Sequence, residues 1–222
     1  VATLDVITNG RTEIGIGAGW YQEEYKAYGY TYFSDIIRIL QLEESIQIIK
    51  KLWTQKIANF RGKYYSVNRA ICFPKPIQKP HPTIMVGGAG EKYLLKVVAK
   101  YADRYNLYFG TPQKMERKIN ILKDYNTKNR EIEYSIVLPC LIVDNDEEIE
   151  KIVKKMKKGN MTIDQFKKSA AGGLTVGTID DIINGISQYV NIGVTHFIFH
   201  FLHLDQRVLK KFSRIVKIAK TI

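Results

Sequence analysis

Short β-rich stretches alternate with longer helical stretches along the chain, and this alternation restricts the possible folds more than any other feature of the sequence. The β-rich stretches predict five strands, at residues 12–17, 83–86, 105–109, 134–143 and 195–201. Apolar residues that recur every three or four positions predict helices at 34–54, 91–102, 112–128, 146–158, 179–191 and 204–221. Such an alternation is typical of parallel sheets. It fits both a doubly wound open sheet and a barrel, and periodicity alone does not separate them.

Three further segments do not join the alternation. Residues 59–67, around Arg61-Gly62-Lys63, predict a hairpin or an extended excursion. Segment 73–82 contains four prolines and predicts an irregular connector, because proline restricts both its own backbone and that of the residue before it. Region 159–177 predicts a short helix and a glycine-rich turn. None of these segments resembles a linker, so we expect a single domain over residues 1–222.

The formal net charge of +12 and the pI near 9.5 raise the question of an anionic partner. Many lysines lie in helical stretches such as 150–158, where they form the solvated face. No nucleic-acid-binding motif accompanies them, and no apolar run approaches the ~18 residues of a membrane span. We therefore expect neither a nucleic-acid nor a membrane partner. Cys72 and Cys140 lack a CxxC spacing, which argues against a disulfide framework or a cysteine zinc site and favours a reducing cytoplasm.

The motif Gly15-Ile16-Gly17-Ala18-Gly19-Trp20 has the beginning of a Rossmann dinucleotide-binding fingerprint. The fingerprint needs a third glycine two residues after Ala18, and Trp20 stands there instead. That glycine normally lets a helix pack closely on its strand, which a tryptophan prevents. We interpret the motif as the glycine-rich end of a strand.

A second glycine motif, Gly87-Gly88-Ala89-Gly90, directly follows an apolar strand and precedes a predicted helix. Backbone N–H groups at such a position can converge on an anion, and the helix dipole favours negative charge there. Glycine allows the close approach of a phosphate that a side chain would block. The pattern alone fits a simple strand–helix turn equally well. Its place after a parallel strand, where barrels bind their ligands, favours a binding role.

Several segments together resemble the luciferase-like monooxygenases. The motif Gly15–Trp20, with Asn9-Gly10-Arg11 before it and Glu24 and Gly29 after it, is similar to the fourth-strand region of that family. The resemblance continues in the same order through Phe60-Arg61-Gly62-Lys63-Tyr64-Tyr65, then Pro74-Lys75-Pro76-Ile77-Gln78-Lys79-Pro80-His81-Pro82 with Val86-Gly87-Gly88-Ala89-Gly90, then Tyr101-Ala102-Asp103-Arg104-Tyr105-Asn106 and Val176-Gly177-Thr178. The order and spacing of the segments make the resemblance specific.

The resemblance implies an α/β fold of the (β/α)₈ TIM-barrel type, with a flavin-like cofactor at the carboxyl ends of the strands. The branch most similar to this sequence uses coenzyme F420, an 8-hydroxy-5-deazaflavin that moves hydride, whereas other branches use FMN. The loop Gly87-Gly88-Ala89-Gly90 would hold the cofactor phosphate. Ala18, Gly19 and Trp20 would line the cofactor pocket, and Asn106 would reach it from the sixth strand.

The chain departs from the family pattern in its length. Its five predicted strands correspond to about strands 4–8 with their helices, and five strands cannot close an eight-stranded barrel. A complete barrel has ~250 residues, and this chain has 222. We therefore expect the C-terminal part of a longer protein, with the first three strands preceding it. A naturally shortened, non-catalytic flavin-binding relative is the alternative.

The functional expectation is an oxidoreductase that transfers hydride between a deazaflavin, or FMN, and a small organic substrate, and that is a homo-oligomer, a dimer, when full length. An FMN-dependent monooxygenase is an alternative. No catalytic acid or base can be assigned. His196, His200 and His203 lack a carboxylate at ligand spacing, so we interpret them as hydrogen-bonded histidines rather than metal ligands. Glu24 is a weak candidate for a functional acid, and the tyrosine-rich segment 21–32 predicts a lid or packing surface.

Overall fold

The computed structural model describes residues 1–155, 162, 165 and 175–219, and these divide into two compact units. Unit 1 comprises Val1–Asn106 and Ile121–Ile132, and unit 2 comprises Leu107–Asn120 and Glu133–Ile222. Most of the region 159–177, for which a short helix and a turn were predicted, lies outside the described residues. No helix in the described part of the chain is long and apolar enough to cross a membrane.

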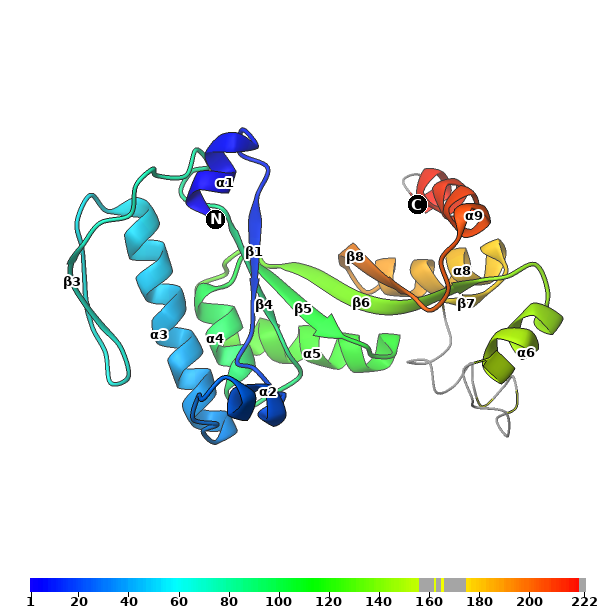
Figure 1. Cartoon of the computed structure of the whole chain (residues 1–222), viewed down its shortest axis with the longest axis horizontal. Helices are drawn as coiled ribbons and strands as arrows, with labels where there is room; N and C mark the ends of the chain where they lie inside the picture. The colour runs from blue at the N-terminus through cyan, green and yellow to red at the C-terminus, as the bar shows by residue number, and fades with distance from the viewer. Residues whose placement is uncertain (156–161, 163–164, 166–174, 220–222) are drawn as a thin grey trace. The chain divides into compact units, whose positions relative to one another are not determined.

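Unit 1 is built on parallel strands (Figure 1). β1 (Glu13–Ile16) pairs with β4 (Thr83–Gly87), which pairs in turn with the first residues of β5 (Arg104–Tyr108). Strand alternation places Ile84, Val86 and Tyr105 on one face, where all three are buried. The helices α3 (Asp35–Thr54) and α4 (Leu94–Tyr101) pack against each other. Leu42, Ile46 and Trp53 form the buried stripe of α3, as the three-and-four spacing predicts.

The predicted hairpin is present in unit 1 as β2 (Ala58–Arg61) and β3 (Ser66–Ala70), which pair antiparallel. Glu44 of α3 fixes its turn, because its carboxylate accepts hydrogen bonds from the backbone N–H groups of Lys63, Tyr64 and Tyr65 at 2.7, 3.0 and 2.8 Å. Burial raises the pKa of the Glu44 carboxyl, but these three donors outweigh it and lower the pKa overall. The proline-rich connector is irregular, as expected.

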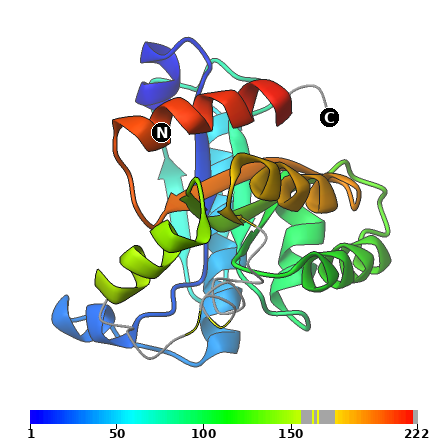
Figure 2. The ribbon, with the colours of Figure 1, turned by 90° about the vertical axis from the view of Figure 1, so that its right-hand side faces the viewer.

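Unit 2 contains β6 (Glu133–Ile142), which pairs in parallel with β8 (Val194–Phe201) and, at its end, with the short β7 (Val176–Gly177). The helices are α6 (Asp146–Lys155), α8 (Ile179–Val190) and α9 (Gln206–Ala219). α8 and α9 lie side by side (Figure 2) and bury the core of Cys140, Ile142, Ile182, Ile186, Val208 and Ile215, with Phe197, Phe199 and Phe201 of β8 packed against it. A capping box between Thr178 and Asp181 begins α8.

Several predicted boundaries are wrong, and two helices were not predicted. α4 begins at Leu94 rather than residue 91, α9 begins at Gln206 rather than 204, and α5 (Pro112–Tyr125), which contributes to both units, ends three residues early. The helices α1 (Ala2–Ile7) and α2 (Gln22–Ala27) have six residues each. A helix of six residues has fewer than about two helical turns, which is too short to show a hydrophobic periodicity in the sequence.

Candidate functional site

The carboxyl ends of β1 and β4 lie side by side in unit 1, next to Asn106 of β5, and the predicted cofactor residues lie there. In the strand register Ile16 stands beside Val86, and Gly87 stands beside Asn106. A Cβ atom added to Gly17 would lie 3.3 Å from the Gly87 carbonyl oxygen. One added to Gly87 would lie 4.0 Å from Oδ1 of Asn106. Gly17, Gly87 and Asn106 are therefore neighbours, and two of the three present bare backbone.

The glycines of the loop after β4 differ in whether the fold could accept a side chain in their place. Gly88 has a φ of +141°, and a Cβ atom there would lie only 2.5 Å from Cδ2 of Leu94. The fold itself therefore needs glycine at this position. Gly87 and Gly90 have no such φ, and a Cβ atom at either would approach other atoms no closer than 3.9 and 3.5 Å. A side chain at Gly87 or Gly90 would thus make ordinary van der Waals contact with its neighbours, and the fold does not require glycine at either position.

The glycine loop does not lead directly into a helix, contrary to the prediction. A turn at residues 91–93 intervenes before α4 begins at Leu94. The N–H group of Leu95 donates to the Gly90 carbonyl at 3.2 Å, which joins the first turn of α4 to the end of the loop. The helix N-terminus is therefore about one turn away from Gly90, and its dipole acts on an anion in the loop less directly than expected.

The loop after β1 contains Ala18, Gly19 and Trp20, and two tyrosines tie it down. The Tyr25 hydroxyl donates to the Ala18 carbonyl at 3.4 Å, and the Tyr32 hydroxyl donates to the Trp20 carbonyl at 3.0 Å. Gly19 has a φ of +76° and lies against the Tyr25 ring, so a side chain there would clash. The Trp20 side chain is 81% exposed. The backbone of this loop is thus fixed, while its indole faces solvent.

Arg38 supports the same loop, and sequence reasoning missed it. It lies in α3, where a charged residue ordinarily belongs to the solvated face, yet only 7% of it is exposed. Its guanidinium lies 4.0 Å from the centre of the Tyr32 ring and donates to the Phe33 carbonyl and, at 2.7 Å, to Asp35. Its Nε has no hydrogen-bond partner in the described structure. Arg38 therefore links α3 to the segment that contains Trp20.

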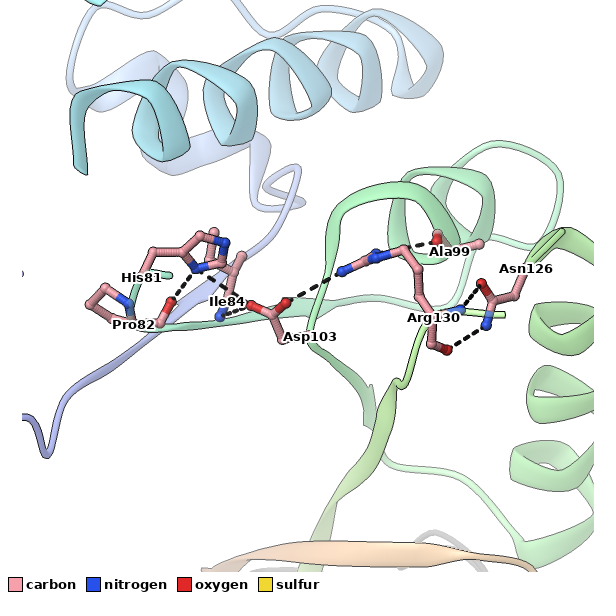
Figure 3. Close-up of polar contacts among 7 residues, drawn as sticks. All are labelled: His81, Pro82, Ile84, Ala99, Asp103, Asn126 and Arg130. Carbon is pink, nitrogen blue, oxygen red and sulfur yellow. Dashed lines mark hydrogen bonds and ion pairs between the residues drawn. The ribbon is translucent and has the colours of Figure 1, made fainter. Parts of the chain in front are cut away.

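Charged groups gather at the opposite, amino ends of these strands (Figure 3). Asp103 accepts hydrogen bonds from the Ile84 N–H group at 2.9 Å and from Arg130 at 3.3 Å, and its carboxylate lies 3.8 Å from Nδ1 of His81. Burial lowers the pKa of the nearby Lys50 ammonium, against the attraction of Asp103. These groups bind one another and the backbone, which is the pattern of a stabilising network.

Asp5 is a fully buried acid, and it too lies away from the glycine loop. Its carboxylate accepts hydrogen bonds from Thr12, from the N–H group of Ile77 and from both the backbone and the side chain of Gln78, at 2.6 to 3.0 Å. Burial raises the pKa of this carboxyl, but the donors outweigh it and hold the pKa far below its usual range. Asp5 joins α1 to the proline-rich connector.

The histidines predicted to be hydrogen-bonded lie in unit 2. Nδ1 of His196 lies 2.8 Å from the Ser135 hydroxyl, and Nε2 of His203 lies 3.5 Å from Asp205. His200 is exposed near the end of β8. Among the described residues no three His, Cys, Asp or Glu side chains cluster closely enough to hold a metal ion. Glu23 and Glu24 lie in α2, where Glu23 forms an exposed ion pair with Lys26 at 3.5 Å.

The chain is similar in sequence to proteins of known family. The model of the luciferase-like monooxygenase family matches residues 1–196. An FMNH2-dependent dimethylsulfone monooxygenase of Pseudomonas putida is 37% identical over 89 residues, which make up 40% of this chain and 24% of that enzyme. An F420-dependent glucose-6-phosphate dehydrogenase of Amycolatopsis mediterranei is 26% identical over 97% of this chain and 71% of its own length. The chain thus spans about a quarter of the first relative and under three quarters of the second.

A solved structure supports the same conclusion on the fold. An F420-dependent secondary alcohol dehydrogenase superposes with a TM-score of 0.81 at 16% identity, over 98% of this chain and 72% of that one. The fold is therefore a parallel-strand α/β fold of the TIM-barrel type, to which this chain contributes β1, β4, β5, β6 and β8. The glycine-rich ends of β1 and β4 lie where such folds bind their ligands. The chain belongs to the luciferase-like monooxygenase family.

Proposed function

We propose that this chain forms part of an oxidoreductase that transfers hydride between a deazaflavin coenzyme and a small organic substrate. The observation that supports the proposal is the row of side-chain-free backbone at Gly17 and Gly87, next to Asn106 and the solvent-exposed loop that ends at Gly90. A planar ring system with a phosphate needs this combination of a flat surface and accessible backbone N–H groups. The names of the relatives point to the same chemistry.

The residues present fit such a coenzyme. Gly87 leaves its backbone without a side chain beside Asn106, and crowding does not require glycine there, since an added Cβ atom would lie 3.9 Å from the Asn106 carbonyl oxygen. Gly87, Gly88, Ala89 and Gly90 would hold the phosphate. Ala18, Gly19 and Trp20 would border the ring, and the Asn106 carboxamide would contact the coenzyme from β5. The bound coenzyme supplies hydride, and these residues orient it and shield it from water.

The choice of the deazaflavin over FMN is the finer part of the proposal. The A. mediterranei relative, which aligns with nearly the whole chain, is F420-dependent, and the net charge of +12 suits an anionic coenzyme tail. An FMN-dependent monooxygenase is the second candidate, since the P. putida relative with the higher identity uses FMNH2. Titration of the purified protein with F420 and with FMN separates the two, because tight binding of FMN with indifference to F420 would reject the deazaflavin.

The role of the loop is tested by Gly87→Ala. The new methyl group meets no atom of the protein closer than 3.9 Å. It should therefore leave the thermal midpoint unchanged and weaken binding of the coenzyme at least tenfold, which is ~1.4 kcal/mol. Gly29→Ala is the converse control: Gly29 is not among the residues proposed to contact the coenzyme and has a φ of +72°, so alanine there should lower the thermal midpoint without changing the affinity for the coenzyme. Equal coenzyme affinity in the Gly87→Ala variant and the unaltered protein would remove this loop from the site.

Three further properties are proposed. We infer a cytoplasmic protein, because neither cysteine is in a disulfide. A dimer is proposed from the family resemblance, and sedimentation of the full-length gene product tests it. The small-molecule substrate is proposed from the names of the relatives.

A further inference from the structure

Unit 2 contains a cavity of about 480 Å³ that the proposed function does not use. The helices α6 and α9 contribute to its walls. It lies at the carboxyl ends of two strands, since Ile142 is the last residue of β6 and Leu202 follows the last residue of β8. These strand ends are where TIM-barrel folds bind their ligands. The cavity also has the size of a small-molecule site, for which roughly 300–1,000 Å³ is usual.

The floor of the cavity is apolar and belongs to the core of the unit. Ile142 and Val208 are 3% and 5% exposed and are members of one core cluster. Ile152 and Leu202 pack against a second cluster. Because these four side chains offer no hydrogen bond, water is held over them weakly. An apolar group of a ligand would displace that water with a gain in free energy.

The rim of the cavity is charged, and its cations outnumber its carboxylates. Three cations and two carboxylates line it, and they are Lys151, Arg207, Lys211, Glu148 and Asp205. His203 lines the cavity as well and adds a positive charge when it is protonated. The lining therefore has a surplus of positive charge.

Both carboxylates are already hydrogen-bonded to the backbone. Glu148 accepts a hydrogen bond from the N–H group of Asp144 at 3.1 Å. Asp205 accepts one from the N–H group of Val208 at 2.8 Å, in the first turn of α9. This N–H group is the main reason that the pKa of the Asp205 carboxyl lies below its usual range. The protein itself thus offsets part of the negative charge that would oppose an anion in the cavity.

The cations are less completely paired. Lys211 forms an ion pair with Asp144 at 2.6 Å. Nε of Arg207 lies 3.7 Å from Asp205, which is too far for a hydrogen bond, and its side chain is 76% exposed. Lys151 forms no ion pair within the part of the chain that the structure describes. Lys151 on α6 and Arg207 on α9 therefore have donors for a further acceptor, one on each wall of the cavity.

We propose that this cavity binds a small aliphatic carboxylate, whose acidic group lies between Lys151 and Arg207 and whose hydrocarbon part covers the floor. A monoanion fits because the lining cations exceed the carboxylates by one. A hydrocarbon part is needed because the floor gives no hydrogen bonds. The inference goes beyond the proposed function, since it needs neither the coenzyme nor the glycine loop of unit 1.

Hexanoate is the probe, titrated into the full-length protein by calorimetry without coenzyme. Butyrate has the same charge and a shorter chain, and hexanol has the same chain length without the charge. Each methylene between butyrate and hexanoate should strengthen binding about three- to fourfold. The carboxylate should make hexanoate bind about three- to tenfold more tightly than hexanol. Added salt should reduce the second difference and not the first.

Lys151→Gln and Arg207→Gln assign the binding to the cavity. Each removes one cation from a wall, so each should weaken hexanoate about threefold and leave hexanol binding unchanged. The matched controls are Lys154→Gln on α6 and Lys210→Gln on α9, two exposed lysines that do not line the cavity. They make the same change in net charge and should leave hexanoate binding unchanged.

Three outcomes would overturn the inference. The first is the absence of hexanoate binding at millimolar concentration, and the second is hexanol binding as tightly as hexanoate. The third is an equal loss in the cavity variants and the controls, because net charge alone would then explain the binding. If a variant does not fold, the comparison of butyrate, hexanoate and hexanol in the unaltered protein still decides. F420 binding is measured separately, so a failure of the proposed function leaves this result standing.

Discussion

Replacing Gly88 by alanine is expected to destabilise the fold, whereas the same change at its neighbour Gly87 is not. At Gly88 the alanine must adopt a φ of +141°, and its methyl group would begin 2.5 Å from Cδ2 of Leu94. A backbone conformation of this kind costs ~1–3 kcal/mol. Crowding a buried leucine costs roughly another 1–3 kcal/mol. The sum of about 2–6 kcal/mol is a large part of the ~5–15 kcal/mol that keeps a typical domain folded.

At Gly87 neither cost applies, because the nearest atom lies 3.9 Å from the added Cβ and the φ is not in the positive range. We expect the free energy of unfolding to change there by no more than ~0.5 kcal/mol. Urea unfolding followed by circular dichroism measures both variants. Binding assays on Gly88→Ala alone would therefore confuse a damaged fold with a blocked site, and Gly87→Ala is the variant that reports on the ligand.

The double variant Gly88→Ala/Leu94→Ala tests the crowding argument directly. Leu94 is 4% exposed, so Leu94→Ala alone should cost about 2–5 kcal/mol. If the methyl group of Ala at position 88 does collide with this leucine, shortening Leu94 relieves the collision. The double variant should then be more stable than the sum of the single changes predicts, by ~1–3 kcal/mol. Strict additivity, or a Gly88→Ala variant as stable as the unaltered protein, would refute the reasoning.

Other predictions concern the acid and the aromatic loop of unit 1. Asp5→Asn should lower the free energy of unfolding at neutral pH. Because the folded-state pKa of Asp5 is depressed, this loss of stability should be constant well above the ordinary carboxyl pKa of 3.8 and should shrink as the pH falls below it. A loss of stability that does not depend on pH would contradict this. The substitution Trp53→Phe leaves Trp20 as the single tryptophan of the chain, so that the fluorescence reports on Trp20 alone. Its emission should change when the coenzyme binds, and binding without such a change would remove Trp20 from the site. Adding Arg38→Met to this variant should release Tyr32 and lower the fluorescence anisotropy of Trp20, and an unchanged anisotropy would show that the loop is held by other contacts.

The sequence predicts the parallel strands and the glycine loop because both depend on local patterns. An apolar run such as 83–86 that ends in glycines can be recognised without any knowledge of its neighbours. The strand register shows which residues of different strands are neighbours, and the sequence alone could not show this. It places Asn106 next to Gly87, and this contact supports the proposed site more than either residue alone.

The contacts that sequence reasoning missed join residues far apart in the chain. Asp5 binds the backbone of Gln78, 73 positions away, and nothing near Asp5 indicates this partner. Arg38 occupies a helix position where a charged residue ordinarily faces solvent, and its burial follows from a tyrosine that folds back over it. Sequence analysis placed Tyr105 in a strand and in a segment that resembles the family, but it did not indicate the hydrogen bond from its hydroxyl to the Gly88 carbonyl at 2.8 Å.

The two ends of the strands in unit 1 differ in the groups that they carry: hydrogen-bonded acidic side chains at the amino ends, and glycine backbone at the carboxyl ends. At the amino ends, Asp5 and Asp103 bind backbone N–H groups and side chains of the protein itself. At the carboxyl ends, Gly87 and Gly90 offer backbone without a side chain to cover it. The backbone of this loop is itself held by internal hydrogen bonds, from the Gly88 N–H group to the Asn106 carbonyl and from the Leu95 N–H group to the Gly90 carbonyl. The charged networks hold the strands at their amino ends, and these backbone contacts hold the loop at the other end. Under the proposed function, the loop would therefore have its shape before the coenzyme binds.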